Sequence, residues 1–302
     1  MLLMLAAALV TQAAPVPASG APSPETARSA AAPHETLTHD NRGRPQIGVM
    51  VNGQGPFPMV VDTAAQTSLL SPSLADELHL PAMASDLTIN GATGSAQAQS
   101  YPVDRFASAL FDARRVGILR LPNPGSTSAR GIVGMEYFAR GKLVFDTTGA
   151  QVLAAPSAPP APGFVAHKGN VRDGTLLVVP IVINGVALLA TVDSGAGVSL
   201  ANHAVLKALG WADDDARLAL AGGIRGATAA TSAVRMARMD KVQIGPVRLA
   251  DVPLFFTPAP NDGAAEEPMI TLGSDILGLL EGYAVDFPRG ELQIRVPAAP
   301  GG

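Results

Sequence analysis

The 302-residue chain contains no cysteine, which excludes disulfides, a lipidated N-terminal cysteine and thiolate metal ligands. It has no long run of charge of one sign and a formal net charge of only −4, so it lacks an electrostatic footprint for nucleic acid. Its five histidines form no i, i+4 pair with metal-ligand spacing. A serine-hydrolase elbow and a phosphate-binding glycine loop are also missing. The sequence therefore predicts no cofactor, no metal and no nucleic-acid partner.

The N-terminal apolar run is too short to cross a bilayer. Residues 1–10 are apolar, whereas a spanning helix needs about 20 such residues. Small residues at Thr11 and Ala13 occupy the positions that a signal peptidase reads. We therefore expect residues 1–13 to be a signal peptide, the mature protein to be periplasmic or secreted, and no stable membrane span to remain. No Lys or Arg precedes Arg28, so the alternatives are a true start upstream of residue 1 or an ordinary apolar N-terminus.

Glycine and proline are abundant and punctuate the chain. The 31 glycines and 26 prolines predict many turns, which favours β-structure over long helices. Proline and alanine gather at residues 14–43 and 154–164. We interpret the first stretch as a disordered leader and the second as an extended linker between two domains, residues 44–153 and 165–297.

A short acidic motif occurs twice. Asp62-Thr63-Ala64 and Asp193-Ser194-Gly195 are 131 residues apart, and each follows an apolar run that reads as a buried strand. An Asn-Gly turn signal stands within each run, at residues 52–53 and 184–185. One acidic residue at the end of a strand says little, but two in matching surroundings suggest a site that needs a pair.

Further landmarks recur in the same order after each motif. Short amphipathic helices are expected at 74–78 and 203–209, the second ending at Gly210. Later each half has a hydrophobic-Gly segment, at residues 132–134 and 271–273, and then a terminal hairpin with its turn at Gly149 or Gly290. Repetition at a fixed order and spacing predicts an internal duplication of two β-rich lobes.

These motifs together resemble those of the retropepsin-like aspartic proteases, the clan of pepsin and the retroviral proteases. The resemblance rests on residues 192–196, 272–277 and 285–287, with matching landmarks in the first repeat. The chain resembles a two-lobed bacterial aspartyl protease of this family. The resemblance implies an all-β acid-protease fold, with two homologous β-barrel-like lobes in one chain and an active-site cleft between them. It also implies a monomer with pseudo-two-fold symmetry and a peptide or protein as substrate.

The resemblance assigns catalysis to Asp62 and Asp193, facing each other at the lobe interface. Such a dyad holds a water between one ionised carboxylate, the base, and one protonated carboxyl, the acid. Two unit charges ~4 Å apart at an effective dielectric of ~20 repel by ~4 kcal/mol, so the pair retains a shared proton. The hydroxyls of Thr63 and Ser194 are expected to cross-link the two loops.

Alanine occupies the fourth position of both motifs, at Ala65 and Ala196. Acid-optimum relatives often carry a hydroxyl there, which would stabilise the charged dyad. Without those hydrogen bonds the pKa values of the dyad should be higher. We therefore expect a mildly acidic to near-neutral optimum.

The first motif departs from the family at Ala64, where the family has the glycine that Gly195 supplies in the second motif. A left-handed backbone at Ala64 would cost roughly 1–2 kcal/mol, and its methyl group would lie near the path of the substrate backbone. Three interpretations stay open: an active aspartic endopeptidase with an asymmetric cleft, a catalytically impaired peptide-binding pseudoprotease, or a degenerate first lobe that functions by dimerisation through the second. A β-rich secreted binding or adhesion module, in which both aspartates only cap turns, is the remaining alternative.

One glycine-rich segment lies about 30 residues after each aspartate, where the resembled family has flaps that close over substrate. They are residues 90–94 and 221–226, and ordinary hairpin turns are the alternative. The expected flap and substrate-binding residues are Gly91, Thr93, Gly94, Gly222, Gly223 and Ile224.

Overall fold

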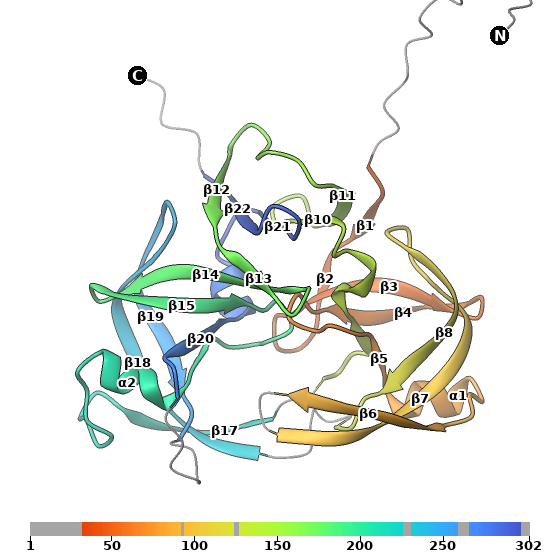
Figure 1. Ribbon diagram of the computed structural model, residues 1–302, viewed down its shortest axis with the longest axis horizontal. Helices are drawn as coiled ribbons and strands as arrows, with labels where there is room; N and C mark the ends of the chain where they lie inside the picture. Colours follow the sequence, from red (N-terminus) through yellow and green to blue (C-terminus); the bar gives the residue numbers. More distant parts are fainter. Residues whose placement is uncertain (1–31, 92–93, 124–126, 226–230, 259–265, 297–302) are drawn as a thin grey trace, which may run out of the picture. The chain divides into compact units, whose positions relative to one another are not determined.

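The first lobe is built on an eight-stranded sheet with the order β2-β3-β4-β9-β5-β8-β7-β6. The computed structural model describes residues 32–91, 94–123, 127–225, 231–258 and 266–296, so the predicted signal peptide lies outside the described residues (Figure 1). The strands of this sheet are β2 (Thr38–His39), β3 (Pro45–Val51), β4 (Gln54–Val61), β5 (Leu69–Leu70), β6 (Met83–Gly91), β7 (Gly94–Ala107), β8 (Asp112–Arg120) and β9 (Gly131–Val133).

The second lobe repeats this sheet strand for strand, with the order β13-β14-β15-β20-β16-β19-β18-β17. Its first four strands in the chain are β13 (Asn170–Arg172), β14 (Leu176–Ile183), β15 (Val186–Val192) and β16 (Leu200–Ala201). The others are β17 (Ala219–Arg225), β18 (Thr231–Ile244), β19 (Val247–Phe256) and β20 (Met269–Leu272). The parallel pairs also match: β4 with β9 and β5 with β8 in one lobe, β15 with β20 and β16 with β19 in the other. This topology agrees with the internal duplication inferred from the sequence.

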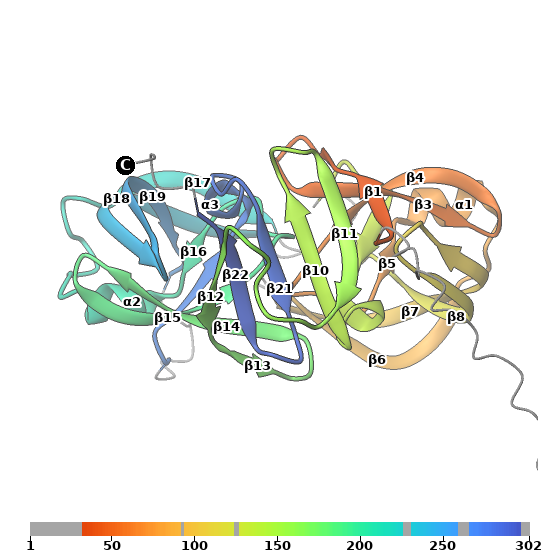
Figure 2. The same cartoon turned by 90° about the horizontal axis from the view of Figure 1, so that it is seen from above.

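A third, six-stranded sheet draws strands from both halves of the chain. Its order is β1-β11-β10-β21-β22-β12, and β10 pairs directly with β21 (Figure 2). At this junction the rings of Phe145 and Tyr283 stack with centroids 4.6 Å apart. The strands are β1 (His34–Thr36), β10 (Gly141–Asp146), β11 (Gln151–Pro156), β12 (Phe164–Lys168), β21 (Tyr283–Asp286) and β22 (Glu291–Arg295).

Helices are few and short, as the abundance of turn residues predicted. The two expected amphipathic helices form as α1 (Pro72–Glu77) and α2 (His203–Ala208). Pro72 suits the first turn of α1 because it needs no amide donor, and the Ser71 hydroxyl caps this helix by accepting from the Leu74 amide at 3.2 Å. A 3-10 turn, η2 (Met135–Tyr137), and helix α3 (Ser274–Leu277) follow the two hydrophobic-Gly segments.

One continuous core of aliphatic and aromatic side chains extends through both lobes, and a smaller apolar cluster lies in the first lobe. Phe106, Phe145 and Phe256 are among the largest fully buried side chains. No helix in the described part of the chain is long and apolar enough to cross a membrane.

The predicted leader and linker need correction. Residues 14–31 of the leader lie outside the described residues, but residues 34–43 are folded, since β1 pairs with β11 and β2 pairs with β3. Ala154 to Pro156 of the predicted linker belong to β11. Ser157 and the Ala158 amide bind the Asp286 carboxylate at 2.7 and 3.1 Å, which fastens the linker to the second half. Prolines at residues 15–33 and 156–162 give both stretches a linker-like composition, although β1 and β2 themselves contain no proline.

Candidate active site

The two motif aspartates lie at equivalent places, each directly after a strand that ends at the lobe interface. Asp62 follows β4 and Asp193 follows β15. Both are tied to the neighbouring parallel strand by the same bond, because their amides donate to Val133 O and Leu272 O, each at 3.0 Å. This lets each loop leave its sheet in the same direction.

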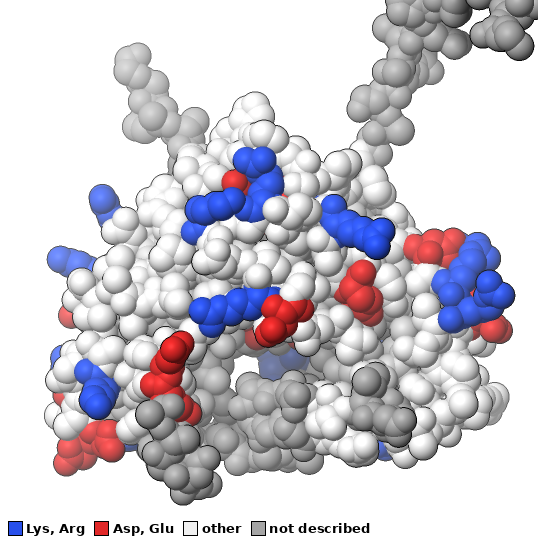
Figure 3. All heavy atoms as spheres, in the orientation of Figure 1, with Lys and Arg blue, Asp and Glu red and all other residues white. Residues whose placement is uncertain are grey.

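The two loops meet closely. A methyl group placed on Gly195 would lie 2.1 Å from Cγ of Asp62, so the α-carbon of Gly195 is packed against that carboxylate. A space-filling view shows the surface hollowed between the two lobes (Figure 3). The fold therefore brings Asp62 and Asp193, 131 residues apart in the sequence, into a single site.

A reciprocal set of hydrogen bonds cross-links the loops. The Thr63 amide donates to Ser194 Oγ at 3.1 Å, and the Ser194 amide donates to Thr63 Oγ1 at 2.9 Å. Each hydroxyl in turn donates across the interface, Thr63 to Val192 O at 2.8 Å and Ser194 to Val61 O at 2.6 Å. Both side chains are buried, so breaking this arrangement would leave several polar groups unsatisfied.

Backbone amides fix the orientation of both carboxylates. Oδ1 of Asp62 accepts from the amides of Ala64 and Ala65, each at 2.9 Å. Oδ1 of Asp193 accepts from the Ala196 amide at 2.9 Å. These bonds favour the ionised forms, and they leave the second oxygen of each group for other partners.

Burial acts against ionisation at both positions. It raises the pKa of Asp62 above its ordinary value, although the amides of Ala64 and Ala65 and the charge of Arg44 work in the opposite direction. Burial raises the pKa of Asp193 further, and the negative charge of Asp62 adds to the rise. The pair therefore retains a proton at a pH where an isolated aspartate would have lost it.

A second layer of polar groups supports each loop from behind, and sequence analysis missed it. The hydroxyls of Ser68 and Ser199 accept from the amides of Gly134 and Gly273 at 3.0 and 2.9 Å. The carboxylates of Glu136 and Asp275 then accept from the Ser68 and Ser199 amides at 2.8 and 2.9 Å. The acidic residue two positions after each glycine was the available signal.

Ala64 does not adopt the left-handed backbone that would have strained it. Neither Ala64 nor Gly195 has a positive φ. The turn is also the same in both loops, since the Ala65 and Ala196 amides donate to Asp62 O and Asp193 O at 3.2 and 3.3 Å. The conformational cost anticipated for Ala64 is thus not incurred.

The predicted flap segments lie in two hairpins, β6–β7 and β17–β18, on the side of the lobes opposite the six-stranded sheet (Figure 1). Gly91 and Gly94 pair with each other at the end of the first hairpin, while Thr93 lies outside the described residues. Residues 221–225 of the second segment belong to β17, so they form a strand of the hairpin and Gly226 lies outside the described residues. Gly222, with a φ of +91°, sits at a register shift in that strand, and Gly223 and Ile224 pair with β18.

Comparison with known families gives the site its context. A protein-family model described as aspartyl protease matches residues 47–137 and 179–276, which is more than half of the chain. The chain belongs to the aspartyl protease family. Each matched segment contains one dyad loop, its supporting serine and its hydrophobic-Gly segment, so the family pattern is present twice. The all-β, two-lobed aspartic-protease fold expected from the sequence is confirmed. A search of curated proteins found no match.

Nothing in the described part of the chain groups three or more His, Cys, Asp or Glu side chains as metal ligands. Backbone amides bind the two carboxylates, while two hydroxyls and a guanidinium hold the loops that carry them, and this arrangement suits two carboxylates that share a proton.

Proposed function

We propose that this aspartyl-protease family member is an aspartic endopeptidase that uses Asp62 and Asp193 as its catalytic dyad. The observation that carries the proposal is a pair of carboxyls on two cross-linked loops. Both carboxyls are buried, which favours sharing of a proton, and backbone amides orient them. The substrate is a peptide or protein held in the cleft under the β6–β7 and β17–β18 hairpins, which act as flaps.

In the proposed reaction the ionised carboxylate takes a proton from a water, whose oxygen attacks the peptide carbonyl carbon. The protonated carboxyl gives its proton to the carbonyl oxygen, forming a neutral diol. One diol proton then returns to the newly ionised carboxylate, and the other carboxyl protonates the amide nitrogen as the C–N bond breaks. The dyad regains its starting state, and the proton count is unchanged.

The environment of the dyad supports a mildly acidic to near-neutral optimum. Burial raises the pKa of both carboxyls, and Ala65 and Ala196 offer backbone amides but no hydroxyl. A pH–rate profile that peaks below about pH 3 would contradict this part of the proposal.

One chain supplies both aspartates, which supports a monomeric enzyme. The matched bonds of the Asp62 and Asp193 loops argue against a degenerate first lobe. The mutual cross-link of the loops likewise argues against aspartates that only cap separate turns. We further propose export to the periplasm or exterior, on the basis of residues 1–13.

Hydrolysis of denatured protein or of a peptide library by the purified mature chain tests the proposal. Asp62→Asn and Asp193→Asn should each lower kcat/KM by about a thousandfold or more, because each removes one proton-transfer group and its charge. Asp214→Asn, at an exposed site, is the matched control and should retain full activity. Full activity in either dyad variant would refute the dyad.

Because Ala64 replaces the glycine of the family motif, one competing function is a pseudoprotease that binds peptides without cleaving them. It predicts no hydrolysis by the wild-type chain at any pH, together with saturable binding of a peptide that carries a transition-state isostere. Thermal protection by that peptide without turnover would favour this function.

A further inference from the structure

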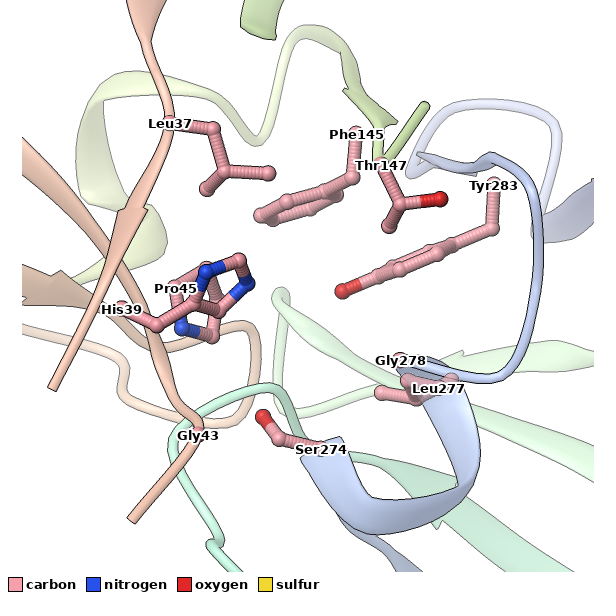
Figure 4. A pocket seen from close by; sticks show the side chains of 10 residues that line it. All are labelled: Leu37, His39, Gly43, Pro45, Phe145, Thr147, Ser274, Leu277, Gly278 and Tyr283. Atoms are coloured by element: carbon pink, nitrogen blue, oxygen red, sulfur yellow. The ribbon is translucent and has the colours of Figure 1, made fainter. Parts of the chain in front are cut away.

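The loop between β2 and β3 crosses from the first lobe to the dyad loop of the second. Arg42 packs on that loop, since a methyl group placed on Gly197 would lie 3.1 Å from its Cβ. Arg44 reaches further, and its Nη1 donates to Gly195 O at 3.2 Å. Figure 4 shows the neighbouring residues His39, Gly43 and Pro45 facing Ser274 and Tyr283 across a small pocket.

Asp40 holds the Arg44 side chain in place. Its Oδ2 accepts from Arg44 Nε at 2.9 Å and from Nη2 at 2.5 Å. Its Oδ1 accepts from the amides of Arg42 and Arg44 at 2.8 and 3.0 Å. The Asp40 side chain is fully shielded from solvent and Arg44 is 6% exposed, so the guanidinium has little freedom. Burial opposes ionisation of Asp40, but the hydrogen bonds with Arg44 outweigh it and lower its pKa.

This contact places positive charge on the Asp62 side of the dyad. Arg44 binds the carbonyl of Gly195, and the α-carbon of Gly195 lies against the Asp62 carboxylate. The charge of this buried guanidinium favours the ionised form of Asp62.

The equivalent hairpin of the second lobe carries no such charge. Thr175 precedes β14 as Arg44 precedes β3, and its buried hydroxyl has no hydrogen-bond partner among the described residues. This hairpin contacts the first dyad loop through a neutral bond, from Gln66 Nε2 to Asp173 O at 2.8 Å. The two sides of the dyad thus differ in charge.

The other ionisable groups near the site do not cancel this difference. Arg172 and Asp173, which have opposite charges, are both exposed on the second hairpin. Tyr283 stays neutral, because burial, followed by the charge of Asp193, raises the pKa of its hydroxyl far above the physiological range. Glu136 and Asp275 are engaged behind the loops of their own lobes with Ser68 and Ser199.

We propose that Arg44, held by Asp40, is a positioning residue that keeps Asp62 ionised and leaves the shared proton on Asp193. This inference rests on the proposed function. It makes Asp62 the base that takes the proton from water and Asp193 the acid that protonates the peptide carbonyl oxygen. The roles then exchange in the second step, as proton balance requires.

The first test measures titration and needs no turnover. In protein labelled with ¹³C at the aspartate carboxyls, with signals assigned from Asp62→Asn and Asp193→Asn, Asp62 should carry most of the lower-pH transition of the dyad. In Arg44→Met that transition should move to higher pH, and Arg44→Lys, which keeps the charge, should restore much of the wild-type behaviour. The double variant Asp40→Asn/Arg44→Met should shift like Arg44→Met while leaving no unpaired buried carboxylate.

The second test is the pH dependence of kcat/KM. The acid limb should move to higher pH in both Arg44→Met variants, with a loss of about fivefold on that limb and a smaller loss on the plateau. Unchanged titration in both variants with native circular dichroism, or a lower-pH transition carried by Asp193, would overturn the inference. A wild-type chain that titrates as expected but hydrolyses nothing would instead refute the proposed function and leave the role of Arg44 standing.

Discussion

The two lobes have the same backbone arrangement but differ in the residues around the two aspartates. The amides of Asp62 and Asp193 make bonds of equal length to the neighbouring strands, and the supporting serines bind equivalent glycines. Within this shared arrangement, Ala64 of the first lobe occupies the position equivalent to Gly195 of the second, and Arg44 the position equivalent to Thr175. Duplication therefore explains how the site is held, whereas the differences decide what each half contributes.

Apart from replacing the aspartates themselves, the largest effect is expected from exchanging the alanine and the glycine that follow in the two dyad loops. Gly195→Ala would place a methyl group 2.1 Å from Cγ of Asp62, and this carboxylate is fixed by two amide bonds. Displacing it should lower kcat/KM by about a hundredfold or more. Ala64→Gly, the matched exchange, removes a methyl group and should stay within about threefold of the wild-type activity.

Steady-state kinetics on both variants, with thermal unfolding as a control for folding, measures this difference. Equal losses in the two variants would mean that the loops are equivalent despite their sequences. A large gain in Ala64→Gly would instead show that the methyl group obstructs the cleft of the natural protein.

A smaller effect concerns stability against pH. The pKa of Asp193 is raised in the folded protein, so its contribution to stability is fully present below the ordinary value of 3.8 and is lost as pH rises through the raised pKa. Asp193→Asn removes that loss, and its free energy of unfolding should exceed that of the wild type at pH 7 by on the order of 1 kcal/mol.

Urea unfolding between pH 4 and pH 7 tests this expectation. The advantage of Asp193→Asn should grow with pH, and Asp62→Asn should show a weaker trend because Arg44 and two amides favour the charge of Asp62. The exposed Asp214→Asn serves as control. A constant difference between wild type and Asp193→Asn across the range would contradict the raised pKa.

The smallest effect distinguishes the ends of helices α1 and α2. Gly210 follows α2 with a φ of +71°, whereas His79 adopts a φ of +53° at the same place after α1. A non-glycine residue is strained in this conformation, so His79→Gly should stabilise the protein by up to about 1 kcal/mol. Gly210→Ala should destabilise it by a similar amount, because its surroundings are open and only the backbone conformation matters.

Thermal denaturation of the two single variants measures both changes, and the double variant should come close to the wild type. No change in His79→Gly would mean that the histidine side chain offsets the strain of its backbone.

The parts of the fold that sequence analysis predicted depend on local patterns. The strand-turn signals around Asn52 and Asn184, the helices and the terminal hairpins are encoded within a few residues, so their repetition was visible. The expectation that Asp62 and Asp193 lie in one site followed from the repeated motif and the family resemblance.

What sequence analysis missed depends on distant contacts. In the sequence, nothing distinguishes Asp40 and Arg44 from an ordinary surface ion pair, because their contact with Gly195, 151 residues beyond Arg44, is made only in the folded protein. Strand β1 exists because β11 offers it a partner, and Gly222 lies within a strand because β17 accommodates it as a register shift against β18. Amino-acid composition and local sequence patterns do not indicate which distant segments pair in the fold.

The ladder between β10 and β21 makes the two halves interdependent for folding. Cut apart, each half would expose a bare strand edge together with the aromatic ring of Phe145 or Tyr283. An edge of this kind recruits any compatible strand, and the strand most similar to the missing one belongs to a second copy of the same half. Because both halves belong to one polypeptide, β10 always has β21 available as its partner. The two halves can therefore diverge in sequence and still pair with each other.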